Sequence, residues 1–358
     1  MRSGILVKWI IAFYLCWLEH AAGECGAKDE GECEPKDCMK LNDTVDAVGI
    51  LGMKILAEMS KRSDNNIAFS PLIIASAMAM MYAGAAGETE KQMKKVLKIS
   101  KDYKNEYNAL LGSSSSRQGV TLNVANSVFT EKCIKIEDDF ESDVECYFKG
   151  KVIDADFKEN PKNETKIINS WIKEKTNGTI KDLLSRNKIT TNSSMALINA
   201  IYFQGDEVSM YIVFPKLKGD TPLKTYMESV MENKKEFLDQ LDYTKMTIQM
   251  IRLLLPKFKI EASVPLRAVF KKIGMNLAFK EKKAEFTNLA KTDDVFISNA
   301  VHKAYIEVNE TRTDKAPKNS SDIFAIKVNR PFMFFIKDEM TGVILLQGAV
   351  RDPKIKIV

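Results

Sequence analysis

Residues 194–203, SMALINAIYF, are the segment that most constrains the fold of this chain. Apolar side chains occupy nearly every position, so the alternation of a half-exposed strand is absent. A run of this length and composition is typical of a strand in the middle of a sheet. The sequence therefore predicts a large sheet with residues 194–203 at its centre.

Helical and strand patterns are mixed on both sides of that strand. A helix is expected from Leu41 to the turn at 63–66, followed by a short strand that Pro71 stops and a buried helix over 72–83. Further helices are expected at 90–97, 137–148, 161–178, 223–240 and 265–277, further strands at 121–130, 150–157, 208–214, 247–261, 295–308, 332–336 and 342–350, and a flexible break at 112–119. The chain is helix-rich early and strand-rich late, which predicts an α+β fold.

The first residues predict the compartment. Arg2 and Lys8 precede the apolar run WIIAFYLCWL, and small residues Ala21 and Gly23 stand before Glu24. This three-part pattern is typical of a secretory signal peptide, here residues 1–23, and predicts a secreted, extracellular protein. A transmembrane anchor is the rival interpretation, but this run and the apolar run 72–87 are both too short to span a bilayer.

Cysteines and glycosylation motifs fit secretion. Removal of Cys16 with the signal peptide leaves five cysteines, of which at least one must stay unpaired. The extension 24–40 is too small and polar to form a core, so we expect disulfides to tie it down, with Cys133 or Cys146 as candidate partners. Its cysteines are Cys25, Cys33 and Cys38, whose spacing matches no zinc site. Six asparagines lie in glycosylation motifs: Asn42, Asn163, Asn177, Asn192, Asn309 and Asn319.

The residues that enzymes need are scarce. The 53 basic and 48 acidic residues nearly balance, which gives no indication of nucleic acid as a partner. His302 is the one histidine after residue 23, and its place in an apolar strand favours a hydrogen-bonded structural role over a catalytic triad. No phosphate loop, zinc-protease motif or calcium loop is present. We therefore expect no catalytic residues, metal or cofactor.

A run of lysines crosses the helix expected at 90–97 and its end. Lys91, Lys94, Lys95 and Lys98 could bind a polyanion such as a glycosaminoglycan. The alternative is a solvated helix face, because Glu88 and Glu90 dilute the charge.

Twenty mostly polar residues separate Glu310 from Pro331, between two apolar strands. Structureless connections of this length are uncommon in compact domains and are usually functional or disordered. We expect residues 311–322 to be exposed and outside any sheet, because their pattern fits no buried strand.

Several motifs together resemble those of the serpin family. NIAFSPLIIASAMAMMYAGAAGET, INSWIKEKTNGTIKDLL, ALINAIYFQG, VHKAYIEVNE and RPFMFFIKDEMTGVILLQGAVRDP occur in the family order from about Leu41 to Pro353. The resemblance implies a serpin domain over 41–358, with a large central sheet, two smaller sheets and about nine helices. It also implies inhibition of a serine peptidase rather than enzymatic activity.

In that family the long loop is the reactive-centre loop, which inserts into the large sheet after cleavage and carries the acyl-enzyme with it. Here the resemblance places the insertion between the strands 194–203 and 295–308, with Ser70, Asn199 and His302 as a polar cluster under the opening. Leu72, Ile73 and Ile74 stand where the family usually has another serine. The loop residues are Thr311, Arg312, Thr313, Asp314, Lys315, Ala316, Pro317, Lys318, Asn319, Ser320 and Ser321.

Two features depart from the family pattern. Gly205 runs straight into DEVSMYIVFP, so a block of strands is missing and the domain is incomplete; a skipped exon, a faulty gene model and a diverged form are open explanations. The loop also lacks the small residues of the family hinge. One strand register would bury Lys315 and Pro317, and the other would bury Arg312, Asp314 and Lys318. Burying an unpaired charge costs several kcal/mol, and Pro317 has no N–H for the ladder.

Three hypotheses about function follow. The protein is a weak inhibitor that uses the loop as bait, a non-inhibitory serpin that binds or carries a ligand, or a non-functional isoform. The sequence does not identify the target peptidase or the scissile bond, which different ways of counting place between Lys315 and Ile326.

Overall fold

The computed structural model describes residues 9–14 and 41–353, apart from 63, 116–119, 186, 206–208, 216–219, 248–250, 293 and 309–323. This described part contains nine α-helices: α1 (Asn42–Arg62), α2 (Pro71–Ala83), α3 (Gly87–Leu97), α4 (Tyr103–Ser115), α5 (Asp138–Phe148), α6 (Pro161–Lys175), α7 (Asp220–Glu232), α8 (Lys234–Asp239) and α9 (Leu266–Lys272). Its strands are β1 (Trp9–Tyr14), β2 (Ile67–Phe69), β3 (Val120–Glu131), β4 (Lys151–Ala155), β5 (Met195–Gly205), β6 (Ser209–Phe214), β7 (Ile251–Leu254), β8 (Phe258–Pro265), β9 (Ile297–Val308), β10 (Phe324–Lys327), β11 (Phe332–Lys337) and β12 (Ile344–Val350).

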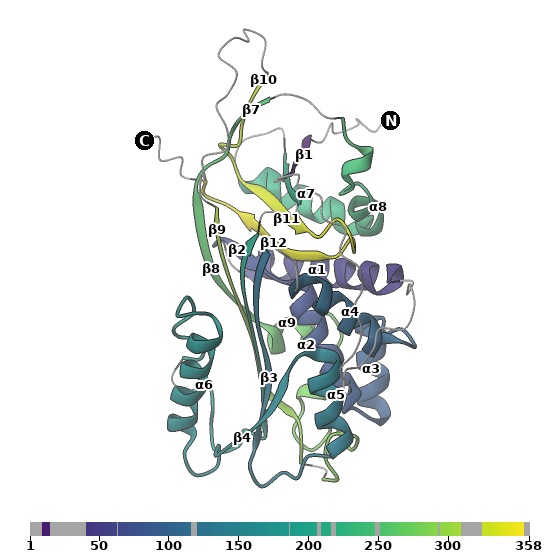
Figure 1. The fold of residues 1–358 in the computed structure, drawn as a ribbon, viewed down its shortest axis with the longest axis vertical. Helices are drawn as coiled ribbons and strands as arrows, with labels where there is room; N and C mark the ends of the chain where they lie inside the picture. Colours follow the sequence, from purple (N-terminus) through teal and green to yellow (C-terminus); the bar gives the residue numbers. More distant parts are fainter. Residues whose placement is uncertain are drawn as a thin grey trace, which may run out of the picture.

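The strands form three sheets, and the predicted α+β class is confirmed (Figure 1). The large sheet has the order β4-β3-β5-β9-β8, which confirms residues 194–203 as its central strand. A second five-stranded sheet has the order β1-β6-β11-β12-β2, and β7 pairs with β10 in a third.

Burial on both faces explains why β5 is apolar throughout. Met195, Leu197 and Ile201 belong to the main core, which also contains α2. The intervening residues Ala196, Ile198 and Ala200 belong to a second core, together with Ile168 and Ile172 of α6. Figure 1 shows α6 on one side of the long strands, and α2, α3 and α5 on the other.

The helix α2 runs through the middle of the main core. All of its residues from Pro71 to Tyr82 are buried. Pro71 occupies the first turn, where its missing N–H costs nothing, and the Ser70 side chain accepts a hydrogen bond from the Ile73 N–H. This capping fixes where the chain turns from β2 into the helix.

The structure corrects several boundaries. The break expected at 112–119 is helical as far as Ser115, because Leu110 and Leu111 are buried and hold the last turns of α4 against the core. The helix expected near 223–240 is two helices, with Asn233 between them.

The largest difference concerns the N-terminus. Trp9–Tyr14, expected within a signal peptide, pairs as strand β1 with β6. An apolar run rich in strand-forming types suits an edge position in a sheet as well as it suits a signal peptide. A signal peptide that is removed cannot also be this strand, so the two descriptions apply to different forms of the chain. No helix among the described residues is long and apolar enough to cross a bilayer.

Candidate functional site

The candidate site is the seam between β5 and β9. The two strands pair directly and in parallel, with Asn199 opposite His302, so no strand lies between them. The strand β9 ends at Val308, and β10 begins at Phe324 and pairs with β7. The loop residues 311–321 lie outside the described residues, so their expected exposure stays a prediction.

The structure brings Ser70, Asn199 and His302 together beneath this seam. The Ser70 N–H donates to His302 Nε2 at 3.1 Å, and His302 Nδ1 lies 2.5 Å from Asn199 Oδ1. All three residues are fully buried. Because Nε2 accepts a hydrogen bond, the ring proton must lie on Nδ1 and point to the Asn199 oxygen.

This geometry suits a structural histidine and excludes His302 as a general base. Burial lowers the pKa of His302 to about 3, because desolvation penalises the charged imidazolium. The single lone pair of the neutral ring is already used by the Ser70 N–H. At the seam, His302 therefore serves as a buried, hydrogen-bonded structural residue and not as an acid or a base.

Sequence reasoning missed a fourth member of this polar cluster. Asn126 of β3 lies opposite Asn199, so Asn126, Asn199 and His302 form a polar row across three strands. Asn126 Oδ1 and Asn199 Nδ2 are buried and have no hydrogen-bond partner among the described residues. Asn126 shares its strand face with Leu122, Val124 and Val128 in the pattern TLNVANSVFT, so the interruption of that apolar face was the available signal.

The cluster has no second hydroxyl next to Ser70. Leu72, Ile73 and Ile74 are fully buried in the core. The nearest downstream hydroxyl, Ser76 Oγ, donates to the Ile73 carbonyl within α2 at 3.0 Å. The hydrogen bond from the Ser70 N–H to His302 Nε2 therefore links the start of α2 to β9 without help from a second hydroxyl at positions 72–74.

The remaining predicted residues lie away from the seam. Asn42, Asn163, Asn177 and Asn192 are exposed, whereas Asn309 and Asn319 are outside the described residues. Cys133 is free and exposed, Cys146 is disulfide-bonded, and Cys25, Cys33 and Cys38 are outside the described residues. No group of three potential metal ligands occurs within the described part of the chain.

The four predicted lysines are exposed along α3 and at its end. Lys91 is paired with Glu88 at 2.6 Å, which leaves Lys94, Lys95 and Lys98 as the less neutralised part of the run. The pKa of Lys54 in α1 is lowered, first by burial and then by the nearby positive charges of Lys98 and Lys234. Lys98 is therefore close enough to α1 for its charge to act on Lys54. Lys94, Lys95 and Lys98 therefore remain as exposed cations on α3 and at its end.

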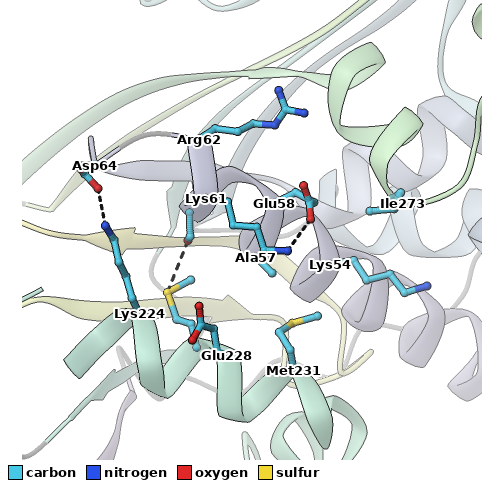
Figure 2. Close-up of a pocket in the computed structure, with 12 residues that line it drawn as sticks. Lys54, Ala57, Glu58, Lys61, Arg62, Asp64, Lys224, Glu228, Met231 and Ile273 are labelled. Atoms are coloured by element: carbon cyan, nitrogen blue, oxygen red, sulfur yellow. Dashed lines mark hydrogen bonds and ion pairs between the residues drawn. The ribbon is translucent and has the colours of Figure 1, made fainter. Parts of the chain in front are cut away.

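A cavity of about 620 Å³ lies between α1 and α7 (Figure 2). Its walls are charged, but much of that charge is paired, because Lys61 contacts Glu58 at 2.9 Å and Lys224 contacts Asp64 at 2.7 Å. The thioethers of Met227 and Met231 add an apolar lining. This cavity suits a small amphipathic ligand better than catalysis.

Comparisons with known proteins agree on one family. A family model described as Serpin (serine protease inhibitor) matches residues 46–206 and 205–353. Serpin B10 of Plecturocebus moloch is 28% identical over an alignment of 385 positions, which covers 84% of this chain and 96% of that protein. The structure of uncleaved ovalbumin superposes with a TM-score of 0.79 at 20% identity, covering 86% of this chain and 99% of that one. The structure of native protease nexin-1 with heparin has a TM-score of 0.78 at 24% identity, covering 87% and 99%.

Proposed function

This chain belongs to the serpin (serine protease inhibitor) family, and we propose that it is a secreted serpin that offers residues 311–321 to a serine peptidase but does not trap it. Secretion is supported by the N-terminal signal pattern and by four exposed glycosylation motifs. Trapping requires the cleaved loop to insert as a strand, and that step is where this chain is poorly equipped.

The observation that carries the proposal is the burial of β5 on both faces. Its alternate residues pack into two separate apolar cores, so a strand inserted beside it would have both of its faces covered along that length. One face would receive Lys315 and Pro317, and the other Arg312, Asp314 and Lys318. Each unpaired charge costs several kcal/mol to bury, so insertion is penalised in either register.

The block of strands that the sequence predicts to be missing after Gly205 would support the same proposal. The two segments of the family match meet at residues 205–206, where β5 ends. The alignment with Serpin B10 runs over 385 positions, more than the 358 residues of the whole chain, so that relative has residues with no counterpart here. Missing strands would leave the end of β5 near Gly205 short of neighbours, which would weaken the sheet into which the loop must insert.

The test is incubation with trypsin-like and elastase-like peptidases, followed by a denaturing gel and mass spectrometry. We expect cleavage within residues 311–321 and no covalent complex. A control variant replaces Arg312, Asp314, Lys315, Pro317 and Lys318 with alanine, which removes the charges and the proline from the inserting segment. Because it also removes the Arg and Lys sites, this variant is compared with the unmodified chain after cutting by the elastase-like peptidase. A stable high-mass band with the unmodified chain would overturn the proposal.

A polyanion is a second partner that we propose for the lysines of α3. The solved structure of native protease nexin-1 contains heparin, and here Lys94, Lys95 and Lys98 are exposed on one helix end. Replacing these three with alanine should lower the salt concentration that elutes the protein from heparin resin. Replacing the exposed Lys162, Lys166 and Lys173 of α6 is the charge-matched control, and an equal loss in both variants would contradict a specific site.

A carrier function is the alternative that the cavity between α1 and α7 favours. It has four cations and three carboxylates on its walls, with two methionines beside them. An apolar compound with one carboxylate or sulfate would match this lining. Saturable binding of such a compound that Met231→Lys abolishes would favour this alternative, whereas its absence would leave the peptidase proposal standing alone.

A further inference from the structure

The edge of the second sheet at β6 depends on the N-terminal segment. On one side β6 pairs antiparallel with β11, from Ser209 opposite Lys337 to Val213 opposite Met333. Its residues Tyr211, Ile212, Val213 and Phe214 are buried. The connection from β5 to β6 contains three residues, 206–208, which leaves no room for a strand between them. The neighbouring sequence therefore supplies nothing to the other side of β6.

That other side is filled by β1 (purple in Figure 1). The pairing is antiparallel and covers β6 from end to end, with Trp9 opposite Phe214 and Tyr14 opposite Ser209. Without it, β6 would be an apolar edge strand with open N–H and C=O groups, which is a template for pairing with other chains. Six residues from near the start of the chain thus pair with the side of β6 that the short β5–β6 connection leaves without a neighbouring strand.

We propose that Trp9–Tyr14 is a structural strand of the uncleaved protein and that removal of residues 1–23 opens the β6 edge. The occupant of this edge is the chain's own N-terminal segment, and its removal leaves β6 open to pairing with a second copy of the shortened chain. The first half of the inference rests on the observed pairing alone, and the second on the proposed cleavage of the signal peptide. Neither half requires the protein to meet a peptidase.

The test uses two proteins of defined length, the full chain and a form that starts at Glu24. We expect the shorter form to unfold at lower denaturant concentration and to self-associate with increasing concentration in analytical ultracentrifugation. A lysine-flanked peptide that contains WIIAFY should reverse both effects, and a scrambled peptide of the same composition should not. Equal unfolding midpoints, with both forms monomeric, would overturn the inference.

Hydrogen exchange on the full chain keeps the test decisive if the shorter form does not fold. One of the two variants Ile10→Pro and Ile11→Pro removes a hydrogen bond between β1 and β6. Amides of residues 209–214 that face β1 should exchange about tenfold more slowly in the native chain than in that variant. Successive amides of a strand point to opposite sides, so only one of these two prolines removes a hydrogen bond to β6, and the other is the matched control. Identical exchange in all three proteins would show that β1 does not pair with β6.

Discussion

At the scale of single residues, His302 depends on being neutral. Its Nε2 accepts from the Ser70 N–H at 3.1 Å, so a proton on Nε2 would face another donor. The ring is fully buried between strands and α2, and none of its hydrogen-bond partners is a carboxylate that could stabilise the imidazolium. The cluster therefore holds together only in the protonation state that the ring has at neutral pH.

A pH dependence of stability follows. The pKa of His302 is about 3 in the folded protein, below the ordinary value of 6.5, so the unfolded chain binds a proton first as the pH falls. The stability from this group is complete above pH 6.5 and is lost between 6.5 and about 3, by up to about 1.4 kcal/mol per pH unit. Denaturant unfolding at several pH values should show this slope, and His302→Gln, which can keep both hydrogen bonds, should have a shallower slope between pH 7 and 5. Equal slopes in both proteins would contradict the assignment.

At the scale of elements, the contact of β12 with β2 depends on a glycine. Gly348 lies opposite Ala68, and a Cβ on it would lie 1.9 Å from the Ile67 carbonyl oxygen and 2.7 Å from the Phe334 ring. A clash with backbone cannot be relieved by rotating a side chain. The two strands can therefore approach this closely only without a side chain at position 348.

Gly348→Ala should lower the free energy of unfolding strongly. Overpacking in a core typically costs about 1–3 kcal/mol, and we expect a loss at the upper end of this range or beyond it. Gly112 in α4 is a suitable control, because a Cβ there would have no atom within 4 Å. Gly112→Ala should instead stabilise the protein by about 0.5–1 kcal/mol through helix propensity. The two unfolding midpoints should move in opposite directions, and a neutral Gly348→Ala would show that the strands can separate at little cost.

How far the sequence predicts these elements depends on whether one physical cause explains a pattern. The apolar run 194–203 has one explanation, a strand covered on both faces, and the structure has that strand. The run at 9–14 has two, because a signal peptide and a strand at the edge of a sheet both favour apolar residues, and the local pattern does not contain the pairing with β6. Predicting that Asn126 lies opposite Asn199 requires the register between β3 and β5, and the local sequence pattern does not contain that register.

At the scale of the whole molecule, the seam between β5 and β9 and the loop after β9 together determine whether the loop can insert. Fifteen residues, 309–323, connect the end of β9 at Val308 to the start of β10 at Phe324, which belongs to the two-stranded sheet of β7 and β10. A cut after Lys318 would leave ten of them, 309–318, attached to β9. A strand that turns back beside the whole of β9 needs about twelve residues plus a turn, so insertion after a cut at this position would stop short of the far end of the seam.

This length, together with the charges, predicts how the protein responds to cleavage of its loop. A serpin whose loop inserts becomes more stable when it is cut, because insertion adds a strand to the central sheet. Here insertion would separate β5 from β9, desolvate Lys315 on one face and Arg312, Asp314 and Lys318 on the other, and place Pro317 in a ladder without an N–H. We therefore expect a cut within 312–321, located by mass spectrometry, to leave the melting temperature almost unchanged. The variant with alanine at Arg312, Asp314, Lys315, Pro317 and Lys318 lacks these penalties and should gain more stability than the unmodified chain when it is cut. A rise of tens of degrees in the unmodified chain, against the few degrees that about 1 kcal/mol produces, would show that the loop inserts and that the protein is a trapping inhibitor after all.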